Sequence, residues 1–389
     1  MILGLLAAML FAPLYWLAVP RQWRREALTV ASLVALGFYD RRLPVLLIGL
    51  CAALFALLRA MRTTPERARA GLAALGLAGL AGLFLWNKLT GNQMSVLPSQ
   101  SGLAFLGISF LVIKAAGALI DTARGTIPAY GFGAVAAWIV LLPTYPAGPM
   151  ETLDHFADQS PSFDRARALG GLERILFGLV KALLVSAYLG IWAAPLLDAP
   201  DKYGPLVLLA GLYAFSLRFY FDFAGYSDIA IGLSALFGYD IDENFDHPFL
   251  RRNLAQLWQH WHMTLTRFLR TYLFMPVARR IMRHGWGDRL GIAAGQIVAM
   301  TFCGLWHGVT WNFAVWGLLQ AVGLIWVGTL ARDLGRRMPP GLVGWWRRSW
   351  AAYALSLILT FNFFSFAVIF AMTDIGGATH YLARLLSLR

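Results

Sequence analysis

Apolar runs long enough to cross a lipid bilayer recur along the whole chain. A transmembrane helix needs roughly 17–25 such residues, because the hydrocarbon core of a bilayer is about 30 Å thick. Charged clusters and Pro/Gly pairs separate the runs, as expected where one helix ends and another begins. We therefore predict helices at residues 2–19, 27–39, 43–58, 71–86, 103–120, 131–142, 175–197, 205–237, 290–305, 313–330 and 350–372.

Composition favours a membrane protein over a soluble one. Of the 389 residues, 59% are hydrophobic and 14% are charged, whereas soluble domains average about 45–50% and about 25%. Several runs are shorter than a full span, and such segments are tolerated at membrane depth only inside protein or beside a water-filled cavity. We expect one all-α membrane domain over residues 1–389. The first run has no basic segment before it and no clear cleavage site, so we expect it to be a retained span.

The net charge of +13 comes mostly from arginine clusters between the apolar runs. This pattern marks loops on the cytoplasmic side of a membrane. No basic cluster is interleaved with stacking aromatic residues in a polar domain, so we predict no nucleic-acid partner. Both cysteines, Cys51 and Cys303, lie in apolar runs, which argues against a disulfide or a metal pair.

Two carboxylates, Asp222 and Asp228, lie within one apolar run. A charge at mid-membrane costs about 2.5–3.5 kcal/mol on an insertion scale, so each needs a partner. Six residues apart on a helix, they do not share a face, which argues against an acid/base pair. We predict structural ion pairs, with Arg218 as a candidate partner of Asp222. Gly225 and Gly232 would allow close approach of a second helix.

The stretch of residues 250–277 mixes arginines, histidines and threonines with aromatic residues, which favours an interfacial or re-entrant helix. An irregular connection precedes it, because Pro248 disfavours helix at the residue before it. On a helix, His260 and His262 would point about 200° apart and would not share one site. A zinc site lacks the expected histidine spacing, so we predict no metal. These residues alone leave the choice between the two histidines open.

His307 ends an apolar run and is followed by Gly308 and an aromatic-rich stretch. One interpretation is structural, with the imidazole bonded to a carbonyl at the membrane interface. The other is functional, because a neutral imidazole in an apolar pocket can remove a proton from a hydroxyl group. The run itself supports both.

Four motifs resemble those of the membrane-bound O-acyltransferases, in particular the bacterial branch with alginate O-acetyltransferase and teichoic-acid D-alanyltransferase. In family order, they are residues 219–228 (FYFDFAGYSD), 243–249 (ENFDHPF), 258–265 (WQHWHMTL) and 304–308 (GLWHG). The resemblance implies about eleven membrane helices, with short re-entrant or interfacial helices, around a central funnel or tunnel. It also places the catalytic histidine at His307 and a second functional histidine at His262.

By the same resemblance, we expect transfer of an acyl group, in the first place acetyl, to a hydroxyl of a cell-surface polysaccharide or polymer. The donor would be a cytoplasmic thioester, acetyl-CoA or an acyl carrier protein, with no bound cofactor. The protein would lie in the bacterial cytoplasmic (inner) membrane, with a periplasmic transferase as a possible partner. We expect five residues to bind substrate, of which Asn253 and Trp306 are candidate oxyanion donors: Tyr226, Asp228, Asn253, Trp258 and Trp306.

The chain also departs from the family pattern. Gln259 and His260 stand where the family often has two arginines, and the Gly-Gly-Asn-Arg-like loop of the alginate branch is missing after Met275. D-alanyl transfer from a carrier protein is therefore an alternative. A third hypothesis is a non-enzymatic transporter or acyl channel, with His307 and Asp228 as a proton relay. Inverted repeats would favour a transporter, and the sequence shows none.

Overall fold

A computed structural model describes residues 2–89 and 103–387, and every regular element within them is helical. Contacts divide these residues into two compact units. The first unit comprises the described residues within 1–92, 98–180 and 225–243, and the second those within 181–224 and 244–389. The single domain over residues 1–389 stays a prediction.

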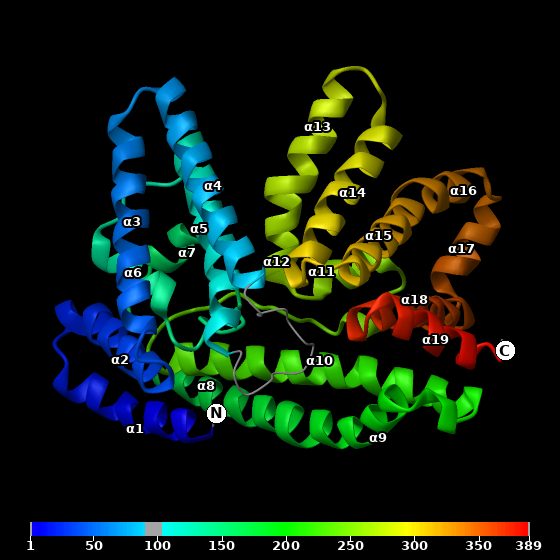
Figure 1. Ribbon diagram of the computed structural model, residues 1–389, viewed down its shortest axis with the longest axis horizontal. Coiled ribbons are helices and arrows are strands. Elements are labelled where there is room, and N and C mark those ends of the chain that lie inside the picture. Colours follow the sequence, from blue (N-terminus) through cyan, green and yellow to red (C-terminus); the bar gives the residue numbers. More distant parts are fainter. Residues whose placement is uncertain (1, 90–102, 388–389) are drawn as a thin grey trace. The chain divides into compact units, whose positions relative to one another are not determined.

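All eleven predicted runs are helical (Figure 1). The first unit contains α1 (Ile2–Ala18), α2 (Arg24–Tyr39), α3 (Leu43–Thr63), α4 (Glu66–Leu89), α5 (Leu103–Arg124), α6 (Phe132–Val140), α7 (Leu153–Ala157) and α8 (Arg165–Leu179). Helix α10 (Pro205–Leu236) belongs to both units. The second unit adds α9 (Ser186–Asp198), α11 (Leu254–His260), α12 (Met263–Phe268), α13 (Met275–Arg283), α14 (Asp288–His307), α15 (Trp311–Ile325), α16 (Arg332–Arg337), α17 (Pro340–Arg348), α18 (Trp350–Met372) and α19 (Ile375–Leu385).

Short 3₁₀ and π segments interrupt or join these helices. The 3₁₀ turns are Arg21–Trp23, Pro200–Lys202 and Pro248–Leu250, and the π segments are Val180–Val185, Leu269–Phe274 and Trp326–Ala331. The π segments continue neighbouring helices without a break, so α8 with α9 and α15 with α16 form longer helical stretches.

Seven helical stretches among the described residues are long and apolar enough to cross a membrane. They are Leu43–Thr63, Glu66–Leu89, Arg165–Ala193, Pro205–Leu236, Asp288–His307, Trp311–Arg337 and Trp350–Met372. The protein is therefore an all-α, multi-pass membrane protein. The number of eleven spans and the central funnel stay predictions.

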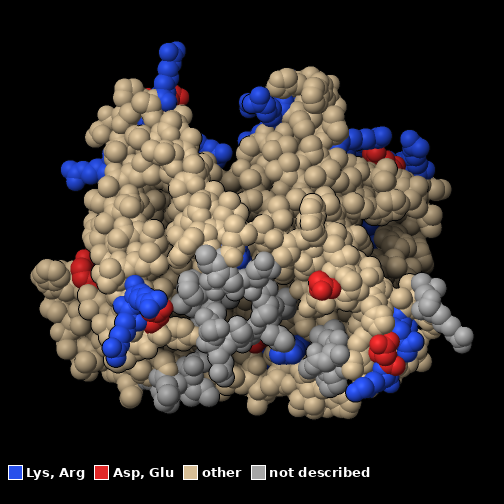
Figure 2. Space-filling view, viewed as in Figure 1, with Lys and Arg blue, Asp and Glu red and all other residues tan. Residues whose placement is uncertain are grey.

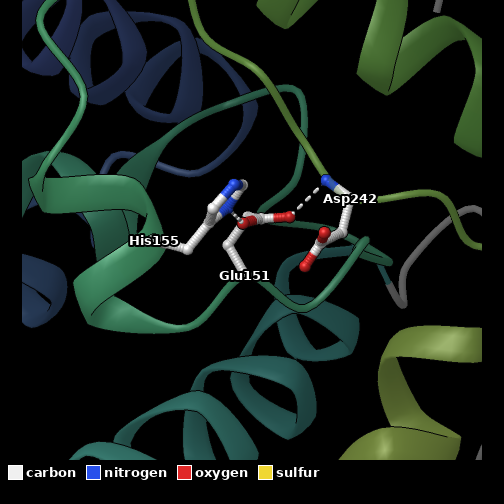
Figure 3. A group of neighbouring side chains, drawn as sticks. All are labelled: Glu151, His155 and Asp242. Carbon is white, nitrogen blue, oxygen red and sulfur yellow. Dashed lines mark hydrogen bonds and ion pairs between the residues drawn. The ribbon is translucent and has the colours of Figure 1, made fainter.

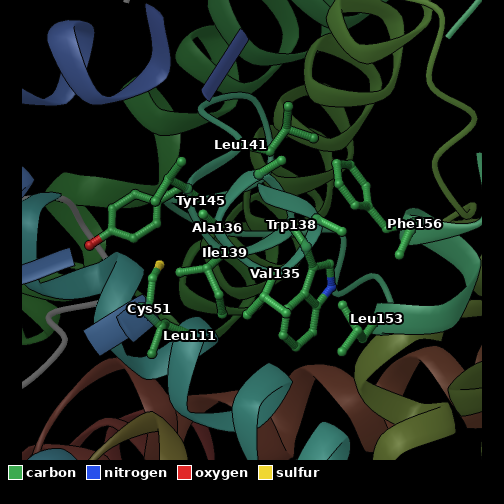
Figure 4. Packing of buried hydrophobic residues seen from close by; sticks show 14 of the residues in the cluster. Cys51, Leu111, Val135, Ala136, Trp138, Ile139, Leu141, Tyr145, Leu153 and Phe156 are labelled. Carbon is green, nitrogen blue, oxygen red and sulfur yellow. The ribbon is translucent and has the colours of Figure 1, made fainter. Parts of the chain in front are cut away.

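Helix α6 is one of the short segments that the sequence predicts to be buried in protein. Its nine residues would span about 14 Å, which is too short for a bilayer. Trp138 is among its buried side chains and packs with Leu111, Leu153 and Phe156 in the core of the first unit (Figure 4). The Trp138 Nε1–H donates to the Glu151 carbonyl oxygen at 2.9 Å.

Helices α8 and α10 approach each other closely in the first unit. A Cβ atom added to Gly171 would lie 2.8 Å from the Gly232 carbonyl oxygen, and one added to Gly178 would lie 2.7 Å from that of Gly225. Only glycine allows backbones to come this near. The predicted packing role of Gly225 and Gly232 is therefore confirmed, and the order of the pairs shows that the two helices run antiparallel.

In the second unit, glycines also bring α14 and α15 together. A Cβ atom on Gly304 would lie 2.2 Å from the Phe313 carbonyl oxygen, and one on Gly317 would lie 2.3 Å from that of Met300. This tight hairpin fixes the end of α14, where His307 lies. A separate apolar core of this unit is closed by Tyr381, whose hydroxyl donates to the Leu208 carbonyl oxygen at 2.7 Å.

Some of the charged side chains lie at the ends of helical hairpins. In the face drawn in Figure 2, lysines and arginines gather at the tip of the α3–α4 hairpin and, separately, at the tip of the α13–α14 hairpin. The sides of these helices are mostly uncharged in the same view. Uncharged sides with charged ends are what helices in contact with lipid require.

Candidate active site

The chain breaks its helical path at His262. Helix α11 ends at His260, Trp261 is extended, and His262 takes a left-handed conformation with φ of 41° before α12 begins at Met263. The stretch of residues 250–277, which the sequence predicts as an interfacial or re-entrant helix, is therefore divided into short helices, with a break at His262. A positive φ is uncommon for a residue other than glycine, so the surrounding contacts must hold this conformation.

Asn244 supplies those contacts from the connection that follows α10. Its carbonyl oxygen accepts from the Met263 N–H at 2.9 Å. Its fully buried Oδ1 accepts from the Thr264 hydroxyl at 3.0 Å and lies 2.9 Å from His262 Nδ1. Because Oδ1 can only accept, Nδ1 carries the proton, and the lone pair of the imidazole is on Nε2. Asn244 thus sets the tautomer of His262.

Burial lowers the pKa of His262 well below its usual value, and the nearby His307 lowers it further. His262 lies in the connection between α11 and α12, outside the seven candidate spans. At neutral pH its imidazole is uncharged and can accept a proton or a hydrogen bond.

His307 is the last residue of α14 and is partly exposed. Its imidazole lies among aromatic rings, with centroids 4.8 Å from Trp306, 5.4 Å from Trp316 and 6.2 Å from Phe313. Trp306 also contacts His262, with their centroids 6.4 Å apart. The structure thus brings the two predicted catalytic histidines and Trp306 into one aromatic cluster.

Trp258 belongs to the same cluster. Its ring lies 6.1 Å from that of Trp316, and its Nε1–H donates to the buried Gln320 Oε1 at 3.0 Å. Asn253 caps α11, where its Oδ1 accepts from the Gln256 N–H at 2.9 Å. A role of either residue in substrate binding stays a prediction.

His260 makes different contacts from His262. Its Nδ1 lies 2.8 Å from the Gln256 carbonyl oxygen, and its Nε2 lies 3.6 Å from a carboxylate oxygen of Asp246. From the residues alone, the sequence left open whether His260 or His262 is the functional histidine. The ring of His260 does not take part in the aromatic contacts described for His262 and His307.

Asp228 and Tyr226 lie in the first unit, where each has a structural partner. Arg174 of α8 donates from Nε to Asp228 Oδ1 at 3.0 Å and also forms a two-point ion pair with Glu243. The Tyr226 hydroxyl donates to the Pro143 carbonyl oxygen at 2.8 Å. The predicted ion pair of Asp228 is confirmed, whereas its role and that of Tyr226 in substrate binding stay predictions.

Glu151, His155 and Asp242 form a second polar group in the first unit (Figure 3). One potential ligand atom from each lies within 4.8 Å of the others, so these residues form a group that could hold a metal ion and that the sequence did not predict. Glu151 is buried, with Oε2 lying 2.5 Å from His155 Nδ1 and Oε1 accepting from the Asp242 N–H at 2.6 Å. The hydrogen bond to Glu151 raises the pKa of His155 to about 9. The His155–Glu151 ion pair and the Asp242–Glu151 hydrogen bond link the segment of α7 to the connection after α10, and we call this group the clasp.

The chain is similar to proteins of one known family. A model of the membrane-bound O-acyltransferase family matches residues 99–373. The teichoic acid D-alanyltransferase of Streptococcus thermophilus is 30% identical over 282 residues, which cover 68% of this chain and 67% of that protein.

Two further relatives carry acetyltransferase names. The probable alginate O-acetylase AlgI of Azotobacter vinelandii is 31% identical over 54% of this chain and 42% of its own length. The peptidoglycan O-acetyltransferase of Helicobacter pylori is 29% identical over 49% of this chain and 36% of its own length. The chain thus spans less than half of these two relatives. The match of the family model over most of the chain nevertheless shows that it belongs to the membrane-bound O-acyltransferase family.

Proposed function

We propose that this protein transfers an acetyl group from a cytoplasmic thioester, acetyl-CoA or an acyl carrier protein, to a hydroxyl group of a cell-surface polymer. The observation that carries this proposal is the cluster of two histidines in an aromatic, largely buried setting. His262 is held there as a neutral imidazole by Asn244, and His307 lies beside Trp306. The acetyltransferase names of two relatives support acetyl as the transferred group.

In the proposed reaction, His307 removes the proton from the acceptor hydroxyl. The hydroxyl oxygen attacks the thioester carbonyl carbon, and the carbon–sulfur bond then breaks. The thiolate leaves and takes a proton, which the His307 imidazolium can return. His262 positions the donor or assists proton transfer through its Nε2. Since a thioester is already activated, the enzyme adds proximity, a base and stabilisation of the oxyanion.

The proposed setting is the bacterial inner membrane, with the donor on the cytoplasmic side. The arginine clusters at hairpin ends, such as that of α13 and α14, support this orientation. A periplasmic transferase that receives the acyl group or completes its transfer is a proposed partner.

His307→Ala tests the proposed base. Purified protein in vesicles is given radiolabelled acetyl-CoA together with cell-envelope polymer, and label in the polymer is measured. Removal of a general base lowers rates by about 10²–10⁴-fold, so transfer should fall by that factor without a lower unfolding temperature. His284→Ala is the matched control, because His284 is an exposed histidine just after α13. Unchanged transfer by His307→Ala would contradict the assignment.

D-alanyl transfer is a second candidate. The alignment with the streptococcal D-alanyltransferase covers 67% of that protein. The alignments with the two acetyltransferases cover smaller shares of those proteins, 42% and 36%. Mass spectrometry of the modified polymer distinguishes an acetyl from a D-alanyl ester. A D-alanyl ester that depends on His307 would favour the second candidate.

A further inference from the structure

Two hydrogen-bond donors on α15 are buried without an acceptor in the part of the chain that the structure describes. Among the described residues, neither Trp316 Nε1 nor Gln320 Nε2 has a hydrogen-bond partner. Trp316 is 6% exposed and Gln320 is fully buried. A buried polar group without a partner costs about 1–3 kcal/mol, and folded proteins contain few of them. Such donors therefore require an explanation, and a ligand with an acceptor atom is one.

Trp258 determines where the Gln320 amide points. An indole N–H can only donate, so the amide atom 3.0 Å from Trp258 Nε1 must be the oxygen. The amide nitrogen then points away from Trp258. Gln320 also follows Trp316 by four residues, so the two side chains lie on the same face of α15. Trp258 thus holds one of the two donors in a fixed orientation.

One of these donors belongs to a ring that contacts His307. The Trp316 ring stands edge-on to the His307 imidazole, with centroids 5.4 Å apart and an interplanar angle of 86°. The Trp258 ring lies on Trp316 at 6.1 Å. Aromatic walls exclude water and strengthen hydrogen bonds made within them. The donors are neutral, which suits a carbonyl oxygen that gains negative charge only during reaction.

We propose that Trp316 Nε1 and Gln320 Nε2 donate hydrogen bonds to the carbonyl oxygen of the acyl thioester. This inference rests on the proposed function. Negative charge develops on that oxygen as the acceptor oxygen bonds to the carbonyl carbon, and it is lost when the carbon–sulfur bond breaks. Trp258 is a positioning residue that holds Gln320. This pair takes the place of Asn253, whose side chain caps α11, as the oxyanion donors.

Trp316→Phe is the decisive variant, because it removes the N–H and keeps an aromatic ring. In the vesicle assay with radiolabelled acetyl-CoA, we expect kcat to fall by about 10²-fold with KM little changed, as for loss of one oxyanion donor. We also expect the unfolding temperature to fall by no more than the few degrees that a smaller buried ring costs, because the variant removes no hydrogen bond made within the described residues. Trp311→Phe is the matched control on the same helix, since Trp311 is 80% exposed; it should change neither quantity.

Trp258→Phe gives a second measurement. It leaves both proposed donors in place but frees the Gln320 amide to rotate, so kcat should fall by less than in Trp316→Phe. A full kcat in Trp316→Phe would overturn the inference alone. A loss of kcat in Trp316→Phe that comes with a larger fall in unfolding temperature than the smaller ring explains, or a loss that also occurs in Trp311→Phe, would overturn it as well, since it would indicate a structural role. No transfer by the unaltered protein would contradict the proposed function, and this inference with it.

Discussion

Two adjacent glycines of α8 should respond to alanine in opposite ways. A Cβ atom on Gly171 would lie 2.8 Å from the Gly232 carbonyl oxygen and 3.2 Å from the Ala235 Cβ. A Cβ atom on Gly170 would meet no atom within 4 Å. Because the obstacle at Gly171 is backbone, α10 as a whole must shift to admit the methyl group.

The magnitude follows from two opposing effects. Alanine is favoured over glycine in a helix by about 0.8–1.0 kcal/mol, which should stabilise Gly170→Ala. Gly171→Ala gains the same amount but also pays for overpacking, which costs about 1–3 kcal/mol. The helix term is common to both variants, so their difference in unfolding free energy should be about 1–3 kcal/mol and reports the helix contact alone.

Thermal unfolding of both variants in the same detergent measures this difference. Gly171→Ala should unfold at the lower temperature, by a few degrees. The shift of α10 should also lengthen the bond between Arg174 and Asp228, which lies between the two glycine contacts. Equal unfolding temperatures for the two variants would refute the close approach of α8 and α10.

Two other predictions concern polar contacts. Asn244→Ala should lower the transfer rate and the stability together. It removes the oxygen that is bonded to His262 Nδ1 and to the Thr264 hydroxyl, and this loss should lower the unfolding free energy by about 1–3 kcal/mol. Unchanged transfer and an unchanged unfolding temperature would refute this role of Asn244. The raised pKa of His155, about 9 against an ordinary 6.5, should make its contribution to stability complete below pH 6.5 and lost as the pH rises through 9. The unfolding free energy of His155→Phe, measured across this pH range, should lack the pH dependence that His155 gives the unaltered protein. If the two proteins show the same pH dependence, the ion pair between His155 and Glu151 does not contribute as predicted.

Helix positions were predictable from the sequence, because they depend on local hydropathy. All eleven apolar runs are helical, and the shortest run gives the buried α6. The break at His262 was not predictable in this way. It depends on hydrogen bonds from Asn244, which lies 18 residues earlier. A left-handed histidine has no local signal comparable to a glycine or proline.

Ion-pair partners show the same division between local and distant information. The sequence indicated that Asp228 needs a partner, because a charge in an apolar run is costly. It did not indicate Arg174, which lies 54 residues away on another helix. For Asp222, the candidate Arg218 is one turn away on the same helix, α10, and this pair stays a prediction. Only partners within one helix follow from spacing.

Residues of the candidate site were predictable where they belong to a motif. A residue whose only signal is its polarity within an apolar run was not predicted. His262 and His307 came from motif resemblance, and the structure places both in contact with Trp306. Gln320 was overlooked, although an amide within the apolar run of α15 is a signal of the same kind as Asp228. A polar side chain at membrane depth requires hydrogen-bond partners. The oxygen of the Gln320 amide has such a partner, the Nε1–H of Trp258.

The aromatic cluster combines two kinds of polar group, and the difference between them has a physical consequence. The Asn244 oxygen is bonded to groups that fix the histidine, so its contacts stabilise the fold and the geometry together. The donors of Trp316 and Gln320 add no such stability, since they have no acceptor among the described residues and an unpaired buried donor lowers stability. Substitutions at the first kind should therefore lower stability and activity together. Substitutions at the second kind should separate the two, and this separation distinguishes a group that binds the reacting oxygen from one that holds the fold.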